Sequence, residues 1–120
     1  MIIKSEKWQF DTDSITVTDL KGSSTRTFYA DHIRYHIKYT CEHYPERLQK
    51  LVDNEDILTY LEEFDIKVTD AICDQTDLLM ENNKEYQIAV ETGNLIDVGS
   101  IGNMIRENAK EIVYKNMIYI

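Results

Sequence analysis

The sequence predicts an α+β fold in which an antiparallel sheet comes first and a helical part follows. Within residues 1–29, apolar and polar side chains alternate, and this period of two is typical of half-buried strands. From residue 30 onward the apolar side chains recur every three or four positions, as they do along helices. One proline and four glycines leave long uninterrupted stretches, which favours helix. We expect a single domain over residues 1–120, with a β meander at 1–29 and helices over 30–120.

The sheet is expected to contain three antiparallel strands. Trp8 and Phe10 alternate with polar neighbours in the first strand, and Ile15 and Val17 do so in the second. The turn-forming segment 22–24 leads into a third strand over residues 25–29. A sheet this small needs another part of the chain to cover its apolar face.

A bundle of about four helices should follow. Asp31 is placed to cap the first helix, and Pro45 ends it because the residue before a proline avoids helical angles. The same proline suits the first turn of a short second helix. The longest helix lies near residues 54–82, with Asp53 or Asn54 as its cap.

The chain after Asn83 is less regular. Residues 86–90 are expected to be a helical or irregular piece that Gly93 and Asn94 interrupt. A last helix follows, and its start depends on Gly99 and Gly102, since glycine is unfavourable inside a helix by about 1 kcal/mol. Either the helix begins only at Ser100 or Asn103, or it begins earlier and the glycines permit close packing. Its predicted apolar side carries Val98, Ile101, Ile105, Ala109, Ile112 and Asn116.

The net charge of −9 is confined to one region of the chain. Residues 53–85 hold eleven acidic and two basic side chains, whereas the rest of the chain holds eleven of each. Five of the acids are separated by seven, four, three and four residues, which places them on one side of the long helix. A solvated outer face and a binding surface for a basic partner both fit this pattern. The five are Glu63, Asp70, Asp74, Asp77 and Glu81.

Composition excludes several classes of protein. The basic side chains are scattered singly, so no basic patch for direct nucleic-acid binding is expected. No signal peptide is recognised at residues 1–8, and no stretch approaches the length of a membrane span. The two cysteines lack a Cys-x-x-Cys spacing, which favours free thiols in a reducing compartment, the cytoplasm.

No constellation of catalytic residues is recognisable, and neither an enzyme nor a cofactor is predicted. Nucleophile-elbow, phosphate-loop and dinucleotide-binding motifs are absent. His32 and His36 have the i, i+4 spacing of a zinc pair, but the glutamate of a His-Glu-x-x-His motif is missing. Cys41 falls on the apolar side of the same helix. Surface or titrating histidines are the expectation, and a metal-dependent enzyme stays an alternative.

Two apolar features remain to be explained. Tyr35 and Tyr39 lie together, away from the apolar stripe of the first helix. They indicate either a helix buried on two sides or an aromatic contact patch for a partner. The segment 117–120 is apolar throughout, so we expect it to dock on the core or on another chain.

The final eighteen residues, 102–119, contain the pattern Asn-x-Ile-Arg-x-x-Ala-x-Glu-Ile-Val followed by Ile-Tyr. The residues of this pattern are Asn103, Ile105, Arg106, Ala109, Glu111, Ile112, Val113, Ile118 and Tyr119. On these residues the segment resembles the closing segment of TnpV, a family of small proteins encoded on transposons of Gram-positive bacteria. More loosely, the resemblance covers about two thirds of the chain; residues 1–30 have no counterpart in it. It implies residence on a mobile element such as a transposon or phage, and it carries no established activity.

Together these features predict a non-enzymatic inhibitor that acts by protein–protein contact. Its acidic helix would occupy the basic groove of a nucleic-acid-binding host protein such as a CRISPR-Cas nuclease, as a DNA mimic. Anti-CRISPR proteins are the analogy, in composition and context only. The alternative is an accessory or structural protein of a mobile element that works as a homodimer or within a larger complex.

Overall fold

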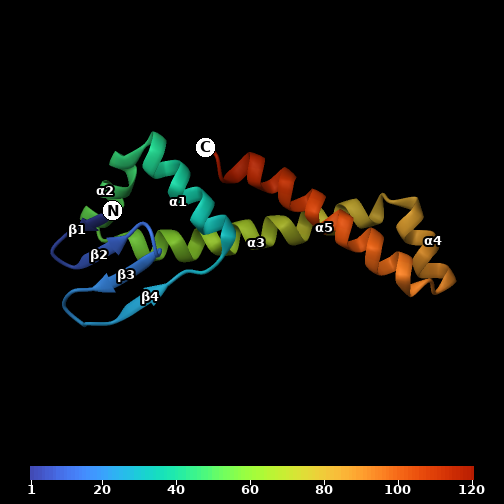
Figure 1. Cartoon of the computed structure of the whole chain (residues 1–120), viewed down its shortest axis with the longest axis horizontal. Coiled ribbons are helices and arrows are strands. Elements are labelled where there is room, and N and C mark those ends of the chain that lie inside the picture. Colours follow the sequence, from blue (N-terminus) through green and yellow to red (C-terminus); the bar gives the residue numbers. More distant parts are fainter. The chain divides into compact units, whose positions relative to one another are not determined.

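The computed structural model describes all 120 residues and has an α+β fold (Figure 1). The strands are β1 (Ile2–Lys4), β2 (Trp8–Asp11), β3 (Thr16–Asp19) and β4 (Thr25–Thr27). The helices are α1 (Asp31–His43), α2 (Pro45–Asp53), α3 (Ile57–Glu81), α4 (Lys84–Thr92) and α5 (Leu95–Met117). An N-terminal antiparallel sheet followed by helices confirms the predicted fold class.

The sheet is a meander with four strands instead of the predicted three. Each strand pairs antiparallel with the next, in the order β1-β2-β3-β4. The additional strand, β1, has only three residues, and Ile3 is its single buried side chain, so no alternation marks it in the sequence. Phe10 pairs with Ile3 on one side and with Val17 on the other, and all three are buried.

The second strand of the prediction, expected over residues 14–18, begins two residues later, at Thr16. Ile15 lies in the turn before β3 with a φ of 54°, a left-handed conformation that β-branched residues rarely adopt. Its side chain is nevertheless buried beside that of Val17. The predicted core positions are therefore correct although the strand boundary is not.

Helix ends differ from the predictions in two places, at the start of α1 and between α2 and α3. Asp31 is the first residue of α1 and not its cap, which is Ala30 without a side-chain hydrogen bond. The chain turns between α2 and α3, so Asp53 ends α2 and α3 begins only at Ile57. Pro45 does occupy the first turn of α2, as predicted.

The less regular region is helical as well, which raises the number of helices to five. The side chain of Asn83 accepts a hydrogen bond from Tyr86 N and begins α4. Gly93 ends α4 with a φ of 70°, a left-handed cap that glycine adopts readily. α5 then begins at Leu95, so both of its glycines, Gly99 and Gly102, lie inside the helix.

The contacts divide the chain into two compact units. Residues Met1–Ile66 together with Ile118–Ile120 form the sheet unit, and Lys67–Met117 form the helical unit. α3 contributes to both. The predicted single domain over 1–120 is not tested by this division, and each unit is described by itself.

The sheet unit contains a continuous hydrophobic core. Apolar residues from the sheet, α1, α2 and the start of α3 pack together in it, and Trp8 also donates a hydrogen bond from Nε1 to Glu55 O at 3.2 Å. The fully buried large side chains of the sheet unit are Phe10, Val17, Ile33, Ile37, Leu48, Val52, Ile57, Leu61 and Ile118. Within the segment expected to dock, Ile118 is buried, whereas Tyr119 and Ile120 are exposed.

The helical unit buries fewer and smaller residues. Gly102, Ile105, Ala109 and Val113 form the buried side of α5, so the predicted stripe is shifted and Ile112 is exposed. Val68 and Ala89 are the other buried residues of this unit. No helix in the chain has both the length and the apolar character that a membrane span requires.

Candidate functional site

Acidic side chains follow one side of α3. Glu63 lies in the sheet unit, and the other four belong to the helical unit. We call those four the acidic face: Asp70, Asp74, Asp77 and Glu81. All five predicted acids are exposed, as expected for side chains opposite an apolar stripe.

None of the five carboxylates has a protein partner. The ion pairs of the chain join other groups: Met1–Asp13, Arg26–Glu62, His32–Asp65, Arg34–Asp31 and Lys110–Glu107. Lys67 lies on the same side of α3, four residues after Glu63 and three before Asp70, but forms no ion pair with either. The acidic face, which begins after Lys67, is therefore an uncompensated row of negative charge.

The position of this row on α3 is unfavourable for the isolated helix. Like charges at i, i+4 repel by a few tenths of a kcal/mol, which applies to Asp70 with Asp74 and to Asp77 with Glu81. Glu81 is also the last residue of α3, where the helix dipole disfavours a negative charge by about 0.3–1 kcal/mol. No basic residue occupies the last turn to offset this. These charges therefore lower the stability of the helix, and no ion pair within the protein offsets the loss.

The two predicted contact tyrosines lie in the sheet unit, on α1. Tyr39 is half-buried among aromatic rings, with ring centroids 4.5 Å from His43 and 5.6 Å from Tyr119. Tyr35 is 40% exposed and borders a cavity below α1. Tyr39 is thus largely a packing residue, and Tyr35 is the more accessible of the two.

The histidines of α1 are engaged within the fold. His36 is buried, with Nδ1 2.9 Å from Ile118 O and Nε2 2.6 Å from the Tyr60 hydroxyl. Burial lowers the pKa of His36, which favours the neutral ring. His32 Nε2 lies 2.6 Å from Asp65 Oδ1. Because both nitrogens of His36 are occupied, the i, i+4 pair has no free ligand atom on that residue, and no three His, Cys, Asp or Glu residues are grouped to hold a metal ion.

Both cysteines are free thiols, one in each unit. Cys73 is exposed on α3, and Cys41 is half-buried on α1. Burial raises the pKa of the Cys41 thiol, which favours the protonated and less nucleophilic form.

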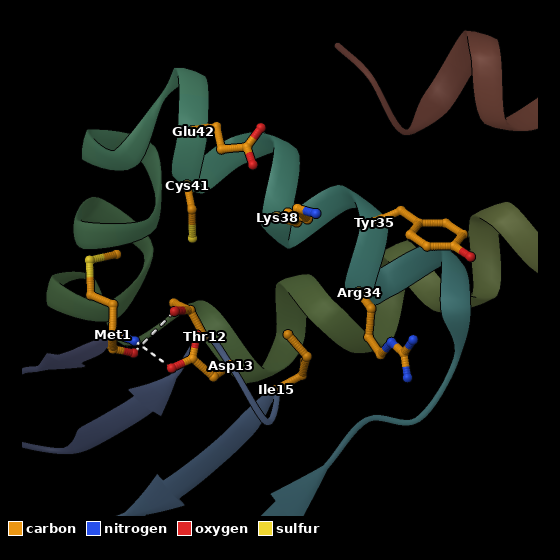
Figure 2. Close-up of a pocket in the computed structure, with 9 residues that line it drawn as sticks. All are labelled: Met1, Thr12, Asp13, Ile15, Arg34, Tyr35, Lys38, Cys41 and Glu42. Carbon is orange, nitrogen blue, oxygen red and sulfur yellow. Dashed lines mark hydrogen bonds and ion pairs between the residues drawn. The ribbon is translucent and has the colours of Figure 1, made fainter.

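The sheet unit also contains a cavity that no sequence pattern predicts. It lies between α1 and the turn joining β2 to β3, and Figure 2 shows the side chains that line it. Arg34 and Lys38 contribute to its rim from α1, and Ile15 lies on its sheet side. The i, i+4 spacing of the two cations was visible in the sequence, but only the tertiary fold brings the turn beneath them.

No protein-family model, curated protein or solved structure matches this chain. The resemblance of residues 102–119 to TnpV therefore stays a prediction, as does the analogy to anti-CRISPR proteins.

Proposed function

We propose that this protein is a non-enzymatic, protein-binding inhibitor that places its acidic face against the basic surface of a nucleic-acid-binding protein. The observation that carries the proposal is the row of four exposed, unpaired carboxylates on α3. From Asp70 to Glu81 the row extends about 16 Å at 1.5 Å per residue. Carboxylates presented in this way compete with phosphates for lysine and arginine side chains, which is the basis of DNA mimicry.

The cost of the row supports this function over simple solubility. Interspersed lysines would keep the surface soluble and add attractive i, i+4 pairs, whereas this arrangement is repulsive along its length. A charged surface of one sign also accelerates association with a basic partner. Phage or transposon origin is what the TnpV resemblance implies, and a CRISPR-Cas nuclease as the target is an analogy in composition and context; both belong to the proposal.

Charge reversal tests the proposal. The variant Asp70→Lys/Asp74→Lys/Asp77→Lys should lose inhibition of DNA cleavage by a Cas nuclease, and wild-type inhibition should weaken as salt rises. A matched control is Glu6→Lys/Glu91→Lys/Glu111→Lys, which makes the same change in net charge at exposed positions outside α3. The control should inhibit like the wild type.

Circular dichroism establishes that both variants are folded. If the folded α3 variant inhibits as well as the wild type, the acidic face is not the contact surface. If the wild-type protein neither inhibits nor binds the nuclease, this target is excluded. A pull-down from bacterial lysate at low and at high salt then identifies any other basic partner.

A second candidate is an accessory or structural protein that acts as an oligomer. The observation favouring it is a set of exposed apolar side chains in the helical unit, above all Leu95 at 82% and Ile96 at 83% exposure. Light scattering separates the candidates, because a dimer that persists at high salt favours the oligomer. The variant Leu95→Ser/Ile96→Ser should then dissociate it, and protection of residues 117–120 in the dimer would show that the C-terminal segment takes part.

A further inference from the structure

The cavity in the sheet unit has the size of a small-molecule site. Its volume is about 640 Å³, within the roughly 300–1,000 Å³ that is typical of ligand pockets. One wall is a face of α1, and the opposite wall is the turn between β2 and β3 together with Met1 (Figure 2). Its lining residues all belong to the sheet unit and include none of the acidic face, so this inference goes beyond the proposed inhibition.

The inner part of the cavity is apolar. Ile15 is 2% exposed, and Cys41 points from α1 toward the turn in Figure 2. The raised pKa keeps the Cys41 thiol neutral, so it adds to this apolar surface. The Met1 side chain completes it. An apolar ligand group would contact these side chains without burying a charge.

The apolar side is also held in a strained conformation. Ile15 has a left-handed φ of 54°, a conformation that is unfavourable for its β-branched side chain. Phe28 N donates to Ile15 O at 3.0 Å, and Asp13 N donates to Asp11 Oδ1 at 2.9 Å, so the surrounding turn fixes this geometry. Strain of this kind is concentrated at functional sites in proteins.

The rim is cationic at one end. Arg34 and Lys38 lie one turn apart on α1, and Lys38 has no hydrogen bond or ion pair. Arg34 has only a long contact of 3.8 Å with Asp31, on the helix surface. The Asp13 carboxylate is taken by the Met1 amino group at 2.9 Å. Glu42, the remaining carboxylate of the rim, is one turn or about 6 Å from Lys38 along α1 and two turns or about 12 Å from Arg34, so the Arg34 end is the cationic one.

We propose that this cavity binds a small amphiphilic carboxylate. The apolar body of the ligand rests against Ile15 and Cys41, and its carboxylate lies between Arg34 and Lys38. Arginine suits a carboxylate because its planar guanidinium donates two parallel hydrogen bonds. The available chemistry fits an aliphatic or an aromatic acid, and the test separates the two.

Nuclear magnetic resonance titration with octanoate and with naphthoate tests the proposal. Either acid should shift amide signals of residues 12–15 and 34–42, and the stronger binder identifies the aliphatic or aromatic class. Acetate, which lacks the apolar body, and octylammonium, which carries the opposite charge, should bind far more weakly. Equal binding of octylammonium, or shifts outside these segments, would overturn the assignment.

Substitution and thiol labelling give independent readouts. Arg34→Gln/Lys38→Gln should lower the affinity for the acid about ten-fold or more, as expected from loss of hydrogen bonds to a charged group. Lys21→Gln/Lys50→Gln makes the same charge change at exposed sites and should bind normally. The bound acid should slow alkylation of Cys41 and leave that of Cys73 unchanged, since Cys73 is in the other unit. Unchanged affinity of the Arg34/Lys38 variant, or equal protection of both thiols, contradicts the site.

Discussion

At the scale of single residues, His36 is a buried side chain with a hydrogen-bond partner for each ring nitrogen. A carbonyl oxygen only accepts, so Nδ1 must donate to Ile118 O, and Nε2 is left to accept from the Tyr60 hydroxyl. The ring also stacks on Phe64 with centroids 4.2 Å apart. Histidine is thus used here as a neutral, doubly bonded core residue that ties the C-terminal segment to α1 and α3.

This environment makes stability depend on pH. The pKa of His36 is lowered in the folded protein, first by burial, so the folded state favours the neutral ring. The contribution is present above the unfolded pKa of 6.5 and is lost as pH falls through the folded pKa. We expect the free energy of unfolding from urea titrations to decrease as pH falls from about 7 to 5.

The variant His36→Gln isolates that contribution. It removes the titrating group, so its free energy of unfolding should change less with pH over the same window. Its carboxylates are those of the wild type, which makes the difference between the two slopes a measure of His36 alone. Equal slopes would show that His36 does not titrate differently in the folded and unfolded states.

A second residue-scale prediction concerns Glu55 in the turn between α2 and α3. Its φ of 64° is left-handed, which costs a non-glycine residue roughly 1–2 kcal/mol. Glu55→Gly should therefore raise the free energy of unfolding by about 1 kcal/mol. The bond from Trp8 to the Glu55 carbonyl is retained, since it involves only the main chain.

The control for this substitution is Glu111→Gly inside α5. The same change of residue at a helical position should lower stability by about 1 kcal/mol. Urea denaturation of both variants gives the comparison. Effects of the same sign would show that the charge removed, and not the backbone conformation, determines the result.

At the scale of elements, α5 is a helix with two glycines inside it. A Cβ added at Gly99 meets nothing within 4 Å, and one at Gly102 meets only ordinary contacts, the nearest being Arg106 at 3.5 Å. The glycines thus do not mark a close approach of backbones. Gly99→Ala should stabilise the protein by about 1 kcal/mol, measured by urea denaturation.

Gly93→Ala provides the opposite case two turns earlier. Its φ of 70° caps α4, so alanine should be destabilising there although it meets no atom within 4 Å. Stabilisation by Gly93→Ala would contradict the left-handed cap of α4, and destabilisation by Gly99→Ala would contradict a helical Gly99 in α5.

The elements also show how far sequence patterns reach. The long apolar period gave α3, and alternation gave β2, because both are set by local geometry. The start of α5 was left open between two alternatives, because glycine propensity opposed a weak capping signal, in which Asn94 and Asp97 hydrogen-bond each other. Helix caps depend on which of several adjacent polar residues turns inward, and tertiary contacts decide that.

The two surfaces differ in the same way. The exposure of the acidic face can be predicted from the spacing of its residues on one helix, and all four of its side chains are exposed in the structure. The cavity joins a turn near residue 13 to a helix near residue 38, which no local pattern encodes. Its strained residue, Ile15, was visible only as an apolar position of a strand.

At the scale of the whole molecule, the buried apolar residues are unevenly divided. The sheet unit contains a continuous core with large side chains such as Phe10, Ile37 and Leu61. In the helical unit the buried residues include Ala89, Gly102 and Ala109, which bury little apolar area. Seven larger side chains of that unit are exposed: Leu78, Ile88, Val90, Leu95, Ile96, Met104 and Ile112.

This division predicts that the two units open with different free energies. Local opening costs least where few apolar contacts are broken, so amides of α4 and α5 should exchange with solvent sooner than those of β2, β3 and α1. Native-state hydrogen exchange at increasing urea measures both sets in one sample. Binding of a partner to the acidic face should slow exchange in the helical unit selectively, because a ligand stabilises the unit it contacts. Equal opening energies for β2 and α5 in the free protein would mean that the chain unfolds as one cooperative body despite its uneven core.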